Sequence, residues 1–600
     1  MSLTMYINKA LVSLVVLFFI NTNIAWSQLP SGYSSELVIN GLFQPMGSVF
    51  NADGTKMFIW VKSGKIYVAN WDGSNYVLQA TPVLDISDEV GDWRDFGFSS
   101  ICLDPDFDNN GLVYMFYMVD REHLMNFGTP GYDPNDNDYY EASISRVTRY
   151  QLNLGSSPLV ANPASRMVLL GESPSTGIPL LHESHAGGTI LFGTDGTLLV
   201  STGDNASYST VDTGSVGHTY YAQAISDGIL RANENVGAFR SQMINSLCGK
   251  VLRLDPATGN GVPSNPFYDE DNPRSAPSRM WAMGLRNPFR MSIKPNSGST
   301  DPNDANPGLL FVVDVGWGSW EDLHIFDKPG LNAGWPLYEG QSIHNGYYNS
   351  GTTNPDEGNV LFKDNCAQPS SWIDDPNPEN RRYTHNRPEV AWGHHNSNDA
   401  RVPWFSGSNA VTRKVGDPGS PTTGSPFSGN TGVAGVYVEG IHMGLEYQNK
   451  YFFTDYSANW IQSGTLNDGS QNWFSDISQF APNDFGLGIV HMMQNPLDGY
   501  IYYVNIFNST IYRLVNNNVL DVTNHNVEDI RMFPNPTSNY LQFNGIKERS
   551  EIKIINIAGQ EVMRFESLNG EAHKINLPSG VYLIDIRNNQ EKIVKRLIVE

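Results

Sequence analysis

The sequence contains little cysteine and little charge for its length. Its 600 residues include only Cys102, Cys248 and Cys366, which are too few and too scattered for a disulfide framework or a cysteine-based zinc site. We expect them to be buried as small apolar residues, and one disulfide between two of them stays open. Charged residues make up 17% of the chain, and the net charge is −24. Because an acidic surface repels phosphate groups, this composition disfavours nucleic-acid and membrane-surface binding.

Long apolar runs are absent after the N-terminal region. Lys9 is followed by the apolar stretch 10–20 and then by Ala25-Trp26-Ser27, an order typical of a secretory signal peptide over residues 1–27. The stretch is shorter than the roughly 20 residues that a permanent membrane anchor needs. We therefore expect an exported protein without membrane insertion.

The common enzyme signatures are also missing. The chain has no Gly-x-Ser-x-Gly elbow, no P-loop and no dinucleotide-binding glycine fingerprint after a strand, which disfavours α/β-hydrolases, P-loop enzymes and Rossmann dehydrogenases. Helical periodicity is absent too, apart from one candidate helix near Ala222–Asn245. These absences favour an all-β chain.

A recurring hairpin pattern is what the sequence does contain. An Asp-Gly pair, typical of a tight turn, is followed by an apolar run typical of a buried strand, at residues 51–60, 193–201 and 496–504. A second short strand often follows, as at residues 64–68 and 509–514. Repetition of this unit predicts a six-bladed β-propeller over residues 28–520, with long loops that gather on one face.

One of these hairpins carries a candidate site. His185 precedes Gly187-Gly188, where the backbone can bend tightly and another group can approach, and Asp204 follows the next strand. Antiparallel strands joined at Asp195-Gly196 would bring His185 and Asp204 to the same edge. A carboxylate beside an imidazole orients the ring and raises its basicity. From the spacing alone, the pair is compatible with a structural role and with a catalytic one.

The end of the chain differs in composition and pattern. Residues 527–600 contain ten basic and ten acidic residues, so the net negative charge resides upstream. Apolar and polar residues alternate in runs separated by Gly and Pro, at residues 551–557, 561–565, 581–586 and 592–599. The pattern predicts a small C-terminal β-sandwich over residues 531–600, after a linker at residues 521–530.

Three motifs of this tail occur in a specific order. They are Phe-Pro-Asn-Pro-Thr at residues 533–537, Ile-Asn-Ile-Ala-Gly at 555–559 and Leu-Pro-Ser-Gly-Val-Tyr at 577–582. With the closing basic-apolar strand, they resemble the type A C-terminal sorting domain of the type IX secretion system. The resemblance implies the type IX secretion machinery as a partner and a secreted or cell-surface protein that crosses the periplasm and outer membrane. A carbohydrate-binding or adhesive β-domain is the alternative.

The body carries a longer ordered set of motifs, which covers residues 41–340 well and the rest to residue 514 loosely. These are the segments 103–114, 185–204, 249–256, 281–290, 313–322 and 332–336. Together they resemble the glucose/sorbosone dehydrogenase family, the soluble sugar dehydrogenases that depend on pyrroloquinoline quinone (PQQ) and are six-bladed propellers.

This resemblance implies catalytic roles for individual residues. His185 would abstract the proton of a sugar hydroxyl while a hydride passes to PQQ, and Asp204 would support the histidine. Arg286 and Asn287 would contact the quinone oxygens, where a guanidinium suits the developing negative charge. Arg286 is also compatible with a salt bridge inside the propeller.

The resemblance also implies a calcium ion that binds PQQ and polarises its reacting carbonyl. The family's ligands are largely backbone carbonyls, which match Gly316 and Trp317, and oxygen ligands suit this hard cation. Asp322 is a further candidate ligand, equally compatible with a structural role.

The sequence departs from the family where the three carboxylates of PQQ are bound. The sugar dehydrogenases use a lysine after a Val-Tyr strand and an Arg-x-Arg pair. Here Val436-Tyr437 is followed by Val438-Glu439, and residues 485–491 contain no arginine. Losing three charge-assisted contacts would weaken binding by about three orders of magnitude. Arg401, Arg413 and Lys414, in an inserted loop, are candidates for replacement cations.

The sequence therefore predicts an exported quinoprotein-type oxidoreductase that oxidises a sugar or polyol and passes electrons to an external acceptor. The main alternative is a non-catalytic propeller that binds a glycan or a protein and has lost PQQ, as in the hedgehog-interacting branch. A Ca²⁺-dependent lactonase is the third possibility.

Overall fold

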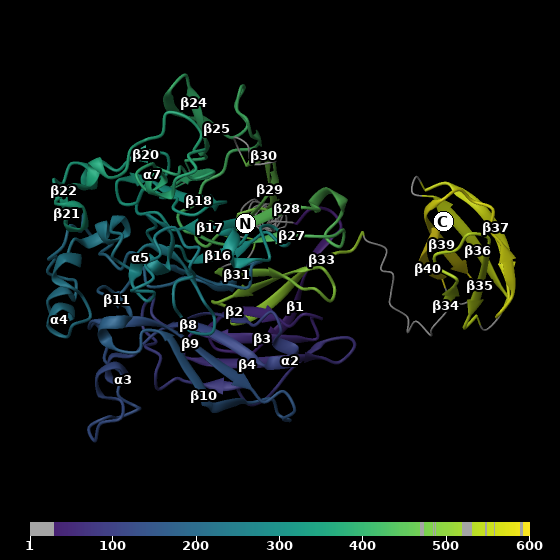
Figure 1. Ribbon diagram of the computed structural model, residues 1–600, viewed down its shortest axis with the longest axis horizontal. Coiled ribbons are helices and arrows are strands. Elements are labelled where there is room, and N and C mark those ends of the chain that lie inside the picture. The colour runs from purple at the N-terminus through teal and green to yellow at the C-terminus, as the bar shows by residue number, and fades with distance from the viewer. Residues whose placement is uncertain are drawn as a thin grey trace, which may run out of the picture. The chain divides into compact units, whose positions relative to one another are not determined.

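The computed structural model describes residues 29–518 and 531–600, except residues 396, 468–472, 484, 486–487, 547–548, 557–558 and 588–591. The chain divides between Val519 and Leu520 into two compact units (Figure 1). The predicted signal peptide at residues 1–27 and the predicted linker at residues 521–530 lie outside the described residues.

The first unit is built from six main sheets of four to six strands. The first three sheets contain β2 (Pro45–Phe50), β3 (Lys56–Val61), β4 (Lys65–Trp71), β5 (Tyr76–Leu78) and β6 (Leu84–Asp85); β7 (Phe98–Leu103), β8 (Leu112–Met118), β9 (Ser143–Leu152), β10 (Ala161–Leu170) and β11 (Ile178–Leu180); and β12 (Ile190–Phe192), β13 (Leu198–Thr202), β14 (Lys250–Leu254) and β15 (Met280–Met283).

The remaining three sheets follow the same order along the chain. They contain β16 (Arg290–Ile293), β17 (Leu310–Asp314), β18 (Trp320–Phe326), β23 (Val390–Gly393), β24 (Ala400–Ser406) and β25 (Asn409–Lys414); β26 (Thr423–Gly424), β27 (Gly432–Val438), β28 (Lys450–Asp455), β29 (Ile461–Leu466) and β30 (Phe474–Ala481); and β31 (Ile489–Gln494), β32 (Ile501–Asn505), β33 (Thr510–Asn516) and β1 (Tyr33–Asn40). Two small ribbons are added by β19 (Tyr338–Glu339) with β20 (Ser342–Ile343) and β21 (Thr353–Asn354) with β22 (Val360–Leu361).

Helices are short, so the all-β prediction is confirmed. The described α-helices are α2 (Phe107–Asn110), α3 (Arg121–Asn126), α4 (Tyr221–Ser226), α5 (Ala276–Arg279), α6 (Asn345–Tyr348) and α7 (Pro378–Arg381). The helix predicted near Ala222–Asn245 is mostly absent, because α4 ends two residues before Gly228, whose φ of 72° breaks the helix. The three cysteines are buried and free, as expected for small apolar residues.

The predicted Asp-Gly turns join the first strand of a sheet to the second. They connect β2 to β3, β12 to β13 and β31 to β32. Gly54, Gly196 and Gly499 have φ values of 71–75°, which glycine adopts at little cost. In each turn the preceding aspartate accepts a hydrogen bond from the backbone N–H two residues on, at 2.8–3.0 Å. This self-contained turn chemistry explains why the sequence pattern predicts the hairpins correctly.

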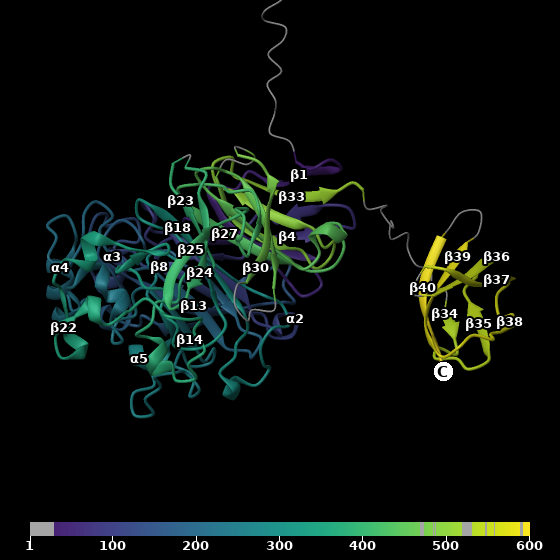
Figure 2. The ribbon, with the colours of Figure 1, turned by 90° about the horizontal axis from the view of Figure 1, so that it is seen from above.

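One strand of each sheet contacts the neighbouring sheets in a closed series, and we call these the inner strands: β2, β7, β12, β16, β27 and β31. Contacts join β2 to β7, β7 to β12, β16 to β27, β27 to β31 and β31 to β2. Met291 of β16 donates to the Thr189 Oγ1 just before β12 at 3.0 Å, which completes the series. The N-terminal β1 pairs antiparallel with β33, so the last sheet is made from both ends of the unit (Figure 2).

Arg290 holds three of these inner strands together. Its guanidinium donates to the carbonyls of Val490 in β31 at 3.1 Å, of Met46 in β2 at 2.8 Å and of Phe289 at 3.0 Å. The side chain is buried, and among the described residues it has no carboxylate partner. Its role is therefore to satisfy backbone carbonyls where three sheets meet.

The second unit contains two antiparallel sheets. One contains β34 (Arg531–Phe533), β35 (Tyr540–Asn544) and β38 (Ala572–Lys574), and the other β37 (Glu561–Ser567), β36 (Ser550–Asn556), β39 (Gly580–Arg587) and β40 (Lys592–Val599). Leu541 and Phe543 of the first sheet and Ile554 and Ile584 of the second belong to one buried cluster. The four strands predicted from alternation are those of the larger sheet. The alternation pattern missed the shorter strands.

We expect Arg290→Met to destabilise the first unit. The change leaves buried carbonyls without a donor, at a cost of about 1–3 kcal/mol for each group left unsatisfied. Arg513→Met is the matched control, because Arg513 pairs with Glu36 and Asp498 at the partly exposed surface, where ion pairs contribute about 0–1 kcal/mol. Urea unfolding followed by tryptophan fluorescence measures both. Equal losses of stability would contradict the role given to Arg290.

Candidate functional site

A cavity of about 500 Å³ lies where the loops before and after the inner strands meet. His185, Arg286, Asn287 and Gly316 all line it, so four of the predicted site residues come together in one place. Apolar side chains from other sheets complete its walls: Met46, Phe289, Val315, Val433, Val490 and Ile506. The cavity is therefore open to a ligand beside His185.

The hairpin of β12 and β13 brings His185 and Asp204 together, as its spacing predicts. The Nδ1 of His185 lies 2.8 Å from Oδ1 of Asp204. The backbones approach so closely that a Cβ on Gly188 would lie 1.8 Å from the Ser201 oxygen, and one on Gly203 would lie 1.8 Å from the His185 oxygen. His185 itself has a φ of 61°, uncommon for a residue other than glycine.

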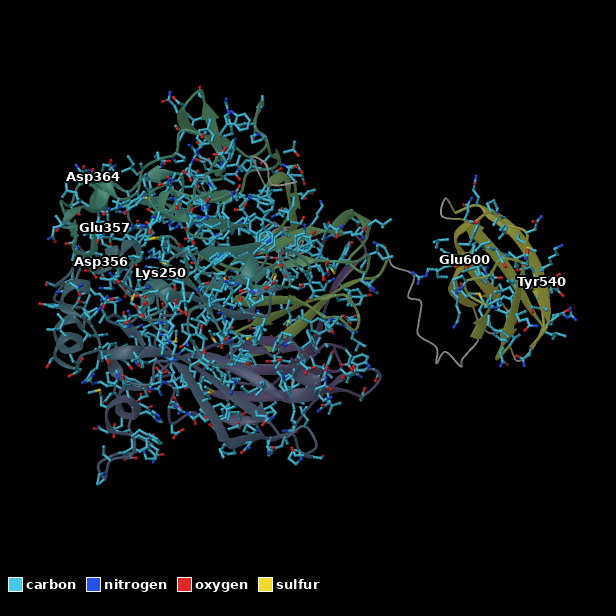
Figure 3. All side chains as sticks on the ribbon, in the orientation of Figure 1. Lys250, Asp356, Glu357, Asp364, Tyr540 and Glu600 are labelled. Carbon is cyan, nitrogen blue, oxygen red and sulfur yellow. The ribbon has the colours of Figure 1, made fainter. Side chains whose placement is uncertain are left out.

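Asp204 is fixed by groups that the sequence pattern does not reveal. Its Oδ2 accepts from Trp335 Nε1 at 2.7 Å, and its backbone carbonyl accepts from Arg240 Nε and Nη2 at 3.2 and 3.1 Å. Lys250, which lies inside the first unit (Figure 3), donates to the Arg240 carbonyl at 3.0 Å. Trp335 lies in the motif at residues 332–336, which supports the family resemblance. The motif alone does not show that the Trp335 indole binds Asp204.

The protonation states of the pair follow from burial and from Arg286. Burial and the Arg286 charge lower the pKa of His185 below its usual range, although the Asp204 carboxylate acts in the opposite direction. Burial acts to raise the pKa of Asp204, but His185 and Arg286 hold it below its usual value. The imidazole is therefore neutral and the carboxylate ionised at pH 7. Since Nδ1–H donates to Asp204, Nε2 is the ring nitrogen left to accept a proton.

Asp314 positions the Arg286–Asn287 segment. Its carboxylate accepts from the backbone N–H of Arg286 at 2.9 Å and of Asn287 at 2.6 Å. Burial raises the pKa of Asp314 to about 7, against the effect of these two hydrogen bonds. Arg286 Nη1 donates to the Val315 carbonyl at 2.8 Å, and its guanidinium lies over the Trp335 ring. Within the described residues, Arg286 Nε and Asn287 Oδ1 are buried and have no hydrogen-bond partner.

The loop that contains Gly316 and Trp317 wraps around Glu339. The backbone N–H groups of Trp317, Gly318, Ser319 and Trp320 all donate to Glu339 Oε1, at 2.7–3.2 Å. A Cβ on Gly316 would lie 1.5 Å from the Trp320 carbonyl oxygen, so the loop requires glycine there. Gly316 lines the cavity, whereas Trp317 is not among its lining residues.

Asp322 does not reach the cavity. It is buried, is not among the cavity-lining residues, and accepts from the Gly340 N–H at 3.0 Å. Burial and the neighbouring Asp314 charge raise its pKa well above the usual range. In the part of the chain that the structure describes, no group of three or more His, Cys, Asp or Glu side chains is placed to hold a metal.

Two cations that the sequence analysis did not single out line the cavity. Lys62 pairs with Asp92 at 2.5 Å, and Arg94 pairs with Glu183 at 3.3 Å. Asp95 and Glu183 line the same cavity, so it carries charges of both signs. Only proximity in the fold identifies these residues, because they lie far from His185 in sequence and in no recognisable motif.

The candidate replacement cations lie elsewhere. Arg401 is in β24 and pairs with Asp399 at 2.9 Å, while Arg413 and Lys414 are in β25, the edge strand of the fourth sheet. None of the three lines the cavity beside His185. The expectation that the inserted loop supplies cations there is not supported by their positions.

Val436-Tyr437 lines a second cavity of about 560 Å³ instead. Arg290 also lines this second cavity. Its guanidinium donates hydrogen bonds to the backbone carbonyls of Met46 and Val490, two residues that line the cavity beside His185. Arg290 therefore lies between the two cavities. The second cavity is the larger, but it lacks the His185–Asp204 pair, and we place the candidate chemistry in the first.

We expect Arg286→Met to raise the pKa of His185. Arg286 is the main charged group that lowers this pKa, so its removal lets the imidazole protonate at a higher pH. Titration of the His185 ring by NMR measures the shift directly. Lys62→Met is the matched control, because Lys62 lines the same cavity with its charge offset by Asp92. A pKa that falls or stays constant in Arg286→Met would contradict this account of the site.

Comparison with curated proteins finds relatives of several kinds. HIPL2 protein of Arabidopsis thaliana is 26% identical over 369 residues, covering 56% of this chain and 46% of that protein. Hedgehog-interacting protein of Homo sapiens is 27% identical over 290 residues, covering 46% and 33%. Aldose sugar dehydrogenase YliI of Escherichia coli is 22% identical over 308 residues, covering 51% and 63%. The chain spans less than half the length of the first two.

Solved structures of low sequence identity also resemble the chain. The PQQ-bound aldose sugar dehydrogenase of Streptomyces coelicolor is 17% identical, with 81% of this chain and 99% of that chain covered and a TM-score of 0.47. The calcium structure of a family AA12 carbohydrate-active enzyme from Trichoderma reesei is 13% identical, with 83% and 99% covered and a TM-score of 0.41.

Two family models match the two parts of the chain. Residues 531–600 match a secretion system C-terminal sorting domain, which points to secretion or the cell surface. The described residues contain no helix that is long and apolar enough to cross a membrane. Residues 42–372, more than half of the chain, match the glucose/sorbosone dehydrogenase model, and the chain therefore belongs to the glucose/sorbosone dehydrogenase family.

Proposed function

We propose that the first unit is an oxidoreductase for a sugar or polyol, with His185 as the general base. The observation that carries this proposal is the 2.8 Å contact between His185 and Asp204 on the wall of an open cavity. A neutral imidazole whose Nδ1–H is held by a carboxylate presents Nε2 to a substrate hydroxyl. General-base catalysis needs this arrangement, and a purely structural pair does not need the cavity.

Oxidation of a carbinol group releases a proton from oxygen and a hydride from carbon. His185 Nε2 takes the proton. When bound, PQQ supplies the carbonyl that accepts the hydride, and an external acceptor removes the electrons afterwards. Arg286 provides fixed positive charge beside the base, where negative charge develops during the transfer.

The cavity residues fit a flat, anionic quinone. Arg286 Nε and Asn287 Oδ1 are buried polar atoms without a hydrogen-bond partner among the described residues, and a ligand with both donors and acceptors would satisfy them. Phe289, Val433 and Val490 provide apolar surface for a ring. Lys62 and Arg94 add positive charge, which Asp92 and Glu183 partly offset. We therefore propose PQQ as the cofactor. Because Lys62 and Arg94 both have carboxylate partners, we expect PQQ to bind less tightly than it would beside unpaired cations.

We propose Ca²⁺ ligands at the carbonyl oxygens of Gly316 and Trp317. The support for this proposal is that Gly316 lines the cavity beside Arg286 and that oxygen ligands suit a hard cation. We assign Asp322 a structural role instead, because its side chain is buried, does not line the cavity and accepts from the Gly340 N–H.

The two family matches also support a proposal for the architecture of each unit. We propose that the six sheets are the blades of a six-bladed β-propeller over residues 28–520. The two sheets that share the Leu541 cluster form a β-sandwich over residues 531–600. The matched sorting domain supports export by the type IX secretion machinery.

We expect His185→Ala to lower turnover by about 10²–10⁴-fold, the usual contribution of a general base. The assay adds PQQ and Ca²⁺ to the full chain and follows dye reduction with a panel of aldoses and polyols, alongside a thermal-shift measurement of cofactor binding. His442→Ala is the control, since this exposed histidine lines the other cavity. Wild-type protein that shows neither dye reduction nor a cofactor-dependent thermal shift would overturn the proposal.

A second candidate function is binding without catalysis. Each of the two added cations has a carboxylate within 3.3 Å, which lowers the attraction for a trianionic cofactor, and human hedgehog-interacting protein is a relative. Under this alternative, PQQ produces no thermal shift, and His185→Ala binds a protein or glycan ligand as well as the wild type does.

A further inference from the structure

A third cavity lies away from the site described above. It measures about 250 Å³ and is bounded by the end of β18, by β24, by the loops 369–374 and 385–389, and by Trp473. It shares no lining residue with the cavity beside His185. Much of its wall follows residue 372, where the family match ends. The cavity is therefore separate from the proposed catalytic site and largely outside the matched region.

Three aromatic side chains line this cavity and are partly exposed: Trp372, Phe405 and Trp473. Trp372 and Phe405 meet edge to face, with their ring centroids 5.1 Å apart and their planes at 78°. The Arg387 guanidinium lies over one face of the Phe405 ring, 5.3 Å from its centroid. Partly exposed aromatic rings in a concavity are typical of a binding surface, since a core would bury them completely.

Polar groups with unused hydrogen-bonding capacity line the same cavity. Asn386 Nδ2 is buried and has no partner among the described residues. Glu389 is 7% exposed, and among the described residues the contact to its Oε2 is a long one of 3.5 Å from the Trp473 N–H. Burial raises the pKa of Glu389 to about 8, so at pH 7 its carboxyl both donates and accepts. An amide and a neutral carboxyl suit hydroxyl groups, which also donate and accept.

The charged groups around the cavity favour neither a strongly anionic nor a strongly cationic ligand. Lys328 pairs with Asp327 at 3.5 Å and donates to the Ile373 carbonyl at 3.1 Å. Arg387 is buried, and its guanidinium donates to Gln341 Oε1 and to the Trp404 and Val411 carbonyls. Each nitrogen of Arg387 therefore has a protein acceptor. Asp327 and Asp374 line the cavity as well, so its wall carries charges of both signs.

We propose that this cavity binds one neutral pyranose ring of a glycan, independently of the cavity beside His185. The apolar C–H face of a pyranose packs on an aromatic ring, while its hydroxyls bond to polar groups at the edge. The volume lies just below the range of about 300–1,000 Å³ typical of drug-sized ligands, which suits a single sugar ring. The site would hold the protein on a glycan while the first cavity stays free.

The test is calorimetric titration of the full chain with neutral and charged probes. The neutral probes are glucose, galactose, mannose and cellobiose, and the charged ones are glucuronate and tetramethylammonium. We expect a neutral sugar to bind the wild type and His185→Ala equally. Trp372→Ala should weaken that binding about tenfold, and Trp372→Phe should restore part of it. Trp71→Ala, at a partly exposed tryptophan in β4, is the matched control and should bind like the wild type.

Three results would overturn the proposal. They are the absence of binding by any neutral sugar at millimolar concentration, binding unaffected by Trp372→Ala, and binding abolished by His185→Ala, which would place the sugar in the first cavity. Tighter binding of either charged probe would also contradict it. Near-ultraviolet circular dichroism of each variant confirms that a loss of binding is not a loss of fold.

Discussion

The candidate site depends on one buried carboxylate. Asp204 accepts from His185 at 2.8 Å, from the Ala206 N–H at 2.9 Å and from the Trp335 indole at 2.7 Å, and its own N–H donates to the Arg286 carbonyl at 2.7 Å. These contacts join loops that are far apart in sequence. An ionised carboxylate in the interior is tolerated only with such a complete set of donors. The requirement to satisfy Asp204 therefore also orients the imidazole and the Arg286 backbone.

Charge in the cavity is arranged so that little of it is uncompensated. Lys62 and Arg94 each have a carboxylate partner, whereas Arg286 directs one nitrogen to a backbone carbonyl and keeps another without a partner among the described residues. Arg286 is thus the cation best placed to respond to a ligand. Burial and the same charge lower the pKa of His185, so Arg286 helps to keep the base neutral and also offers a site for developing negative charge.

Local chemistry determines which features the sequence could predict. The Asp-Gly hairpins and the His185–Asp204 contact follow from turns and strand pairing between near neighbours, and both are present. Trp335, Asp314 and Lys62 reach the site from distant segments, and no spacing rule connects them to His185. Asp322 is the opposite case. It lies in a segment that resembles the family and was a candidate metal ligand, but its side chain is buried and does not line the cavity. Arg401 likewise sits in an outer strand, which the sequence could not reveal without the sheet order.

The inner and outer strands of each sheet are held in place by different contacts. Inner strands are fixed by contacts with the next sheet and by Arg290, which joins β16, β31 and β2 through their carbonyls. The edge strand β25 has no partner strand beyond it among the described residues, so additions there leave the ring of inner strands intact. The family match ends at residue 372, before these strands begin. Such a fold can keep the site beside His185 and gain the proposed sugar site near the outer strands, because the two cavities share no lining residue.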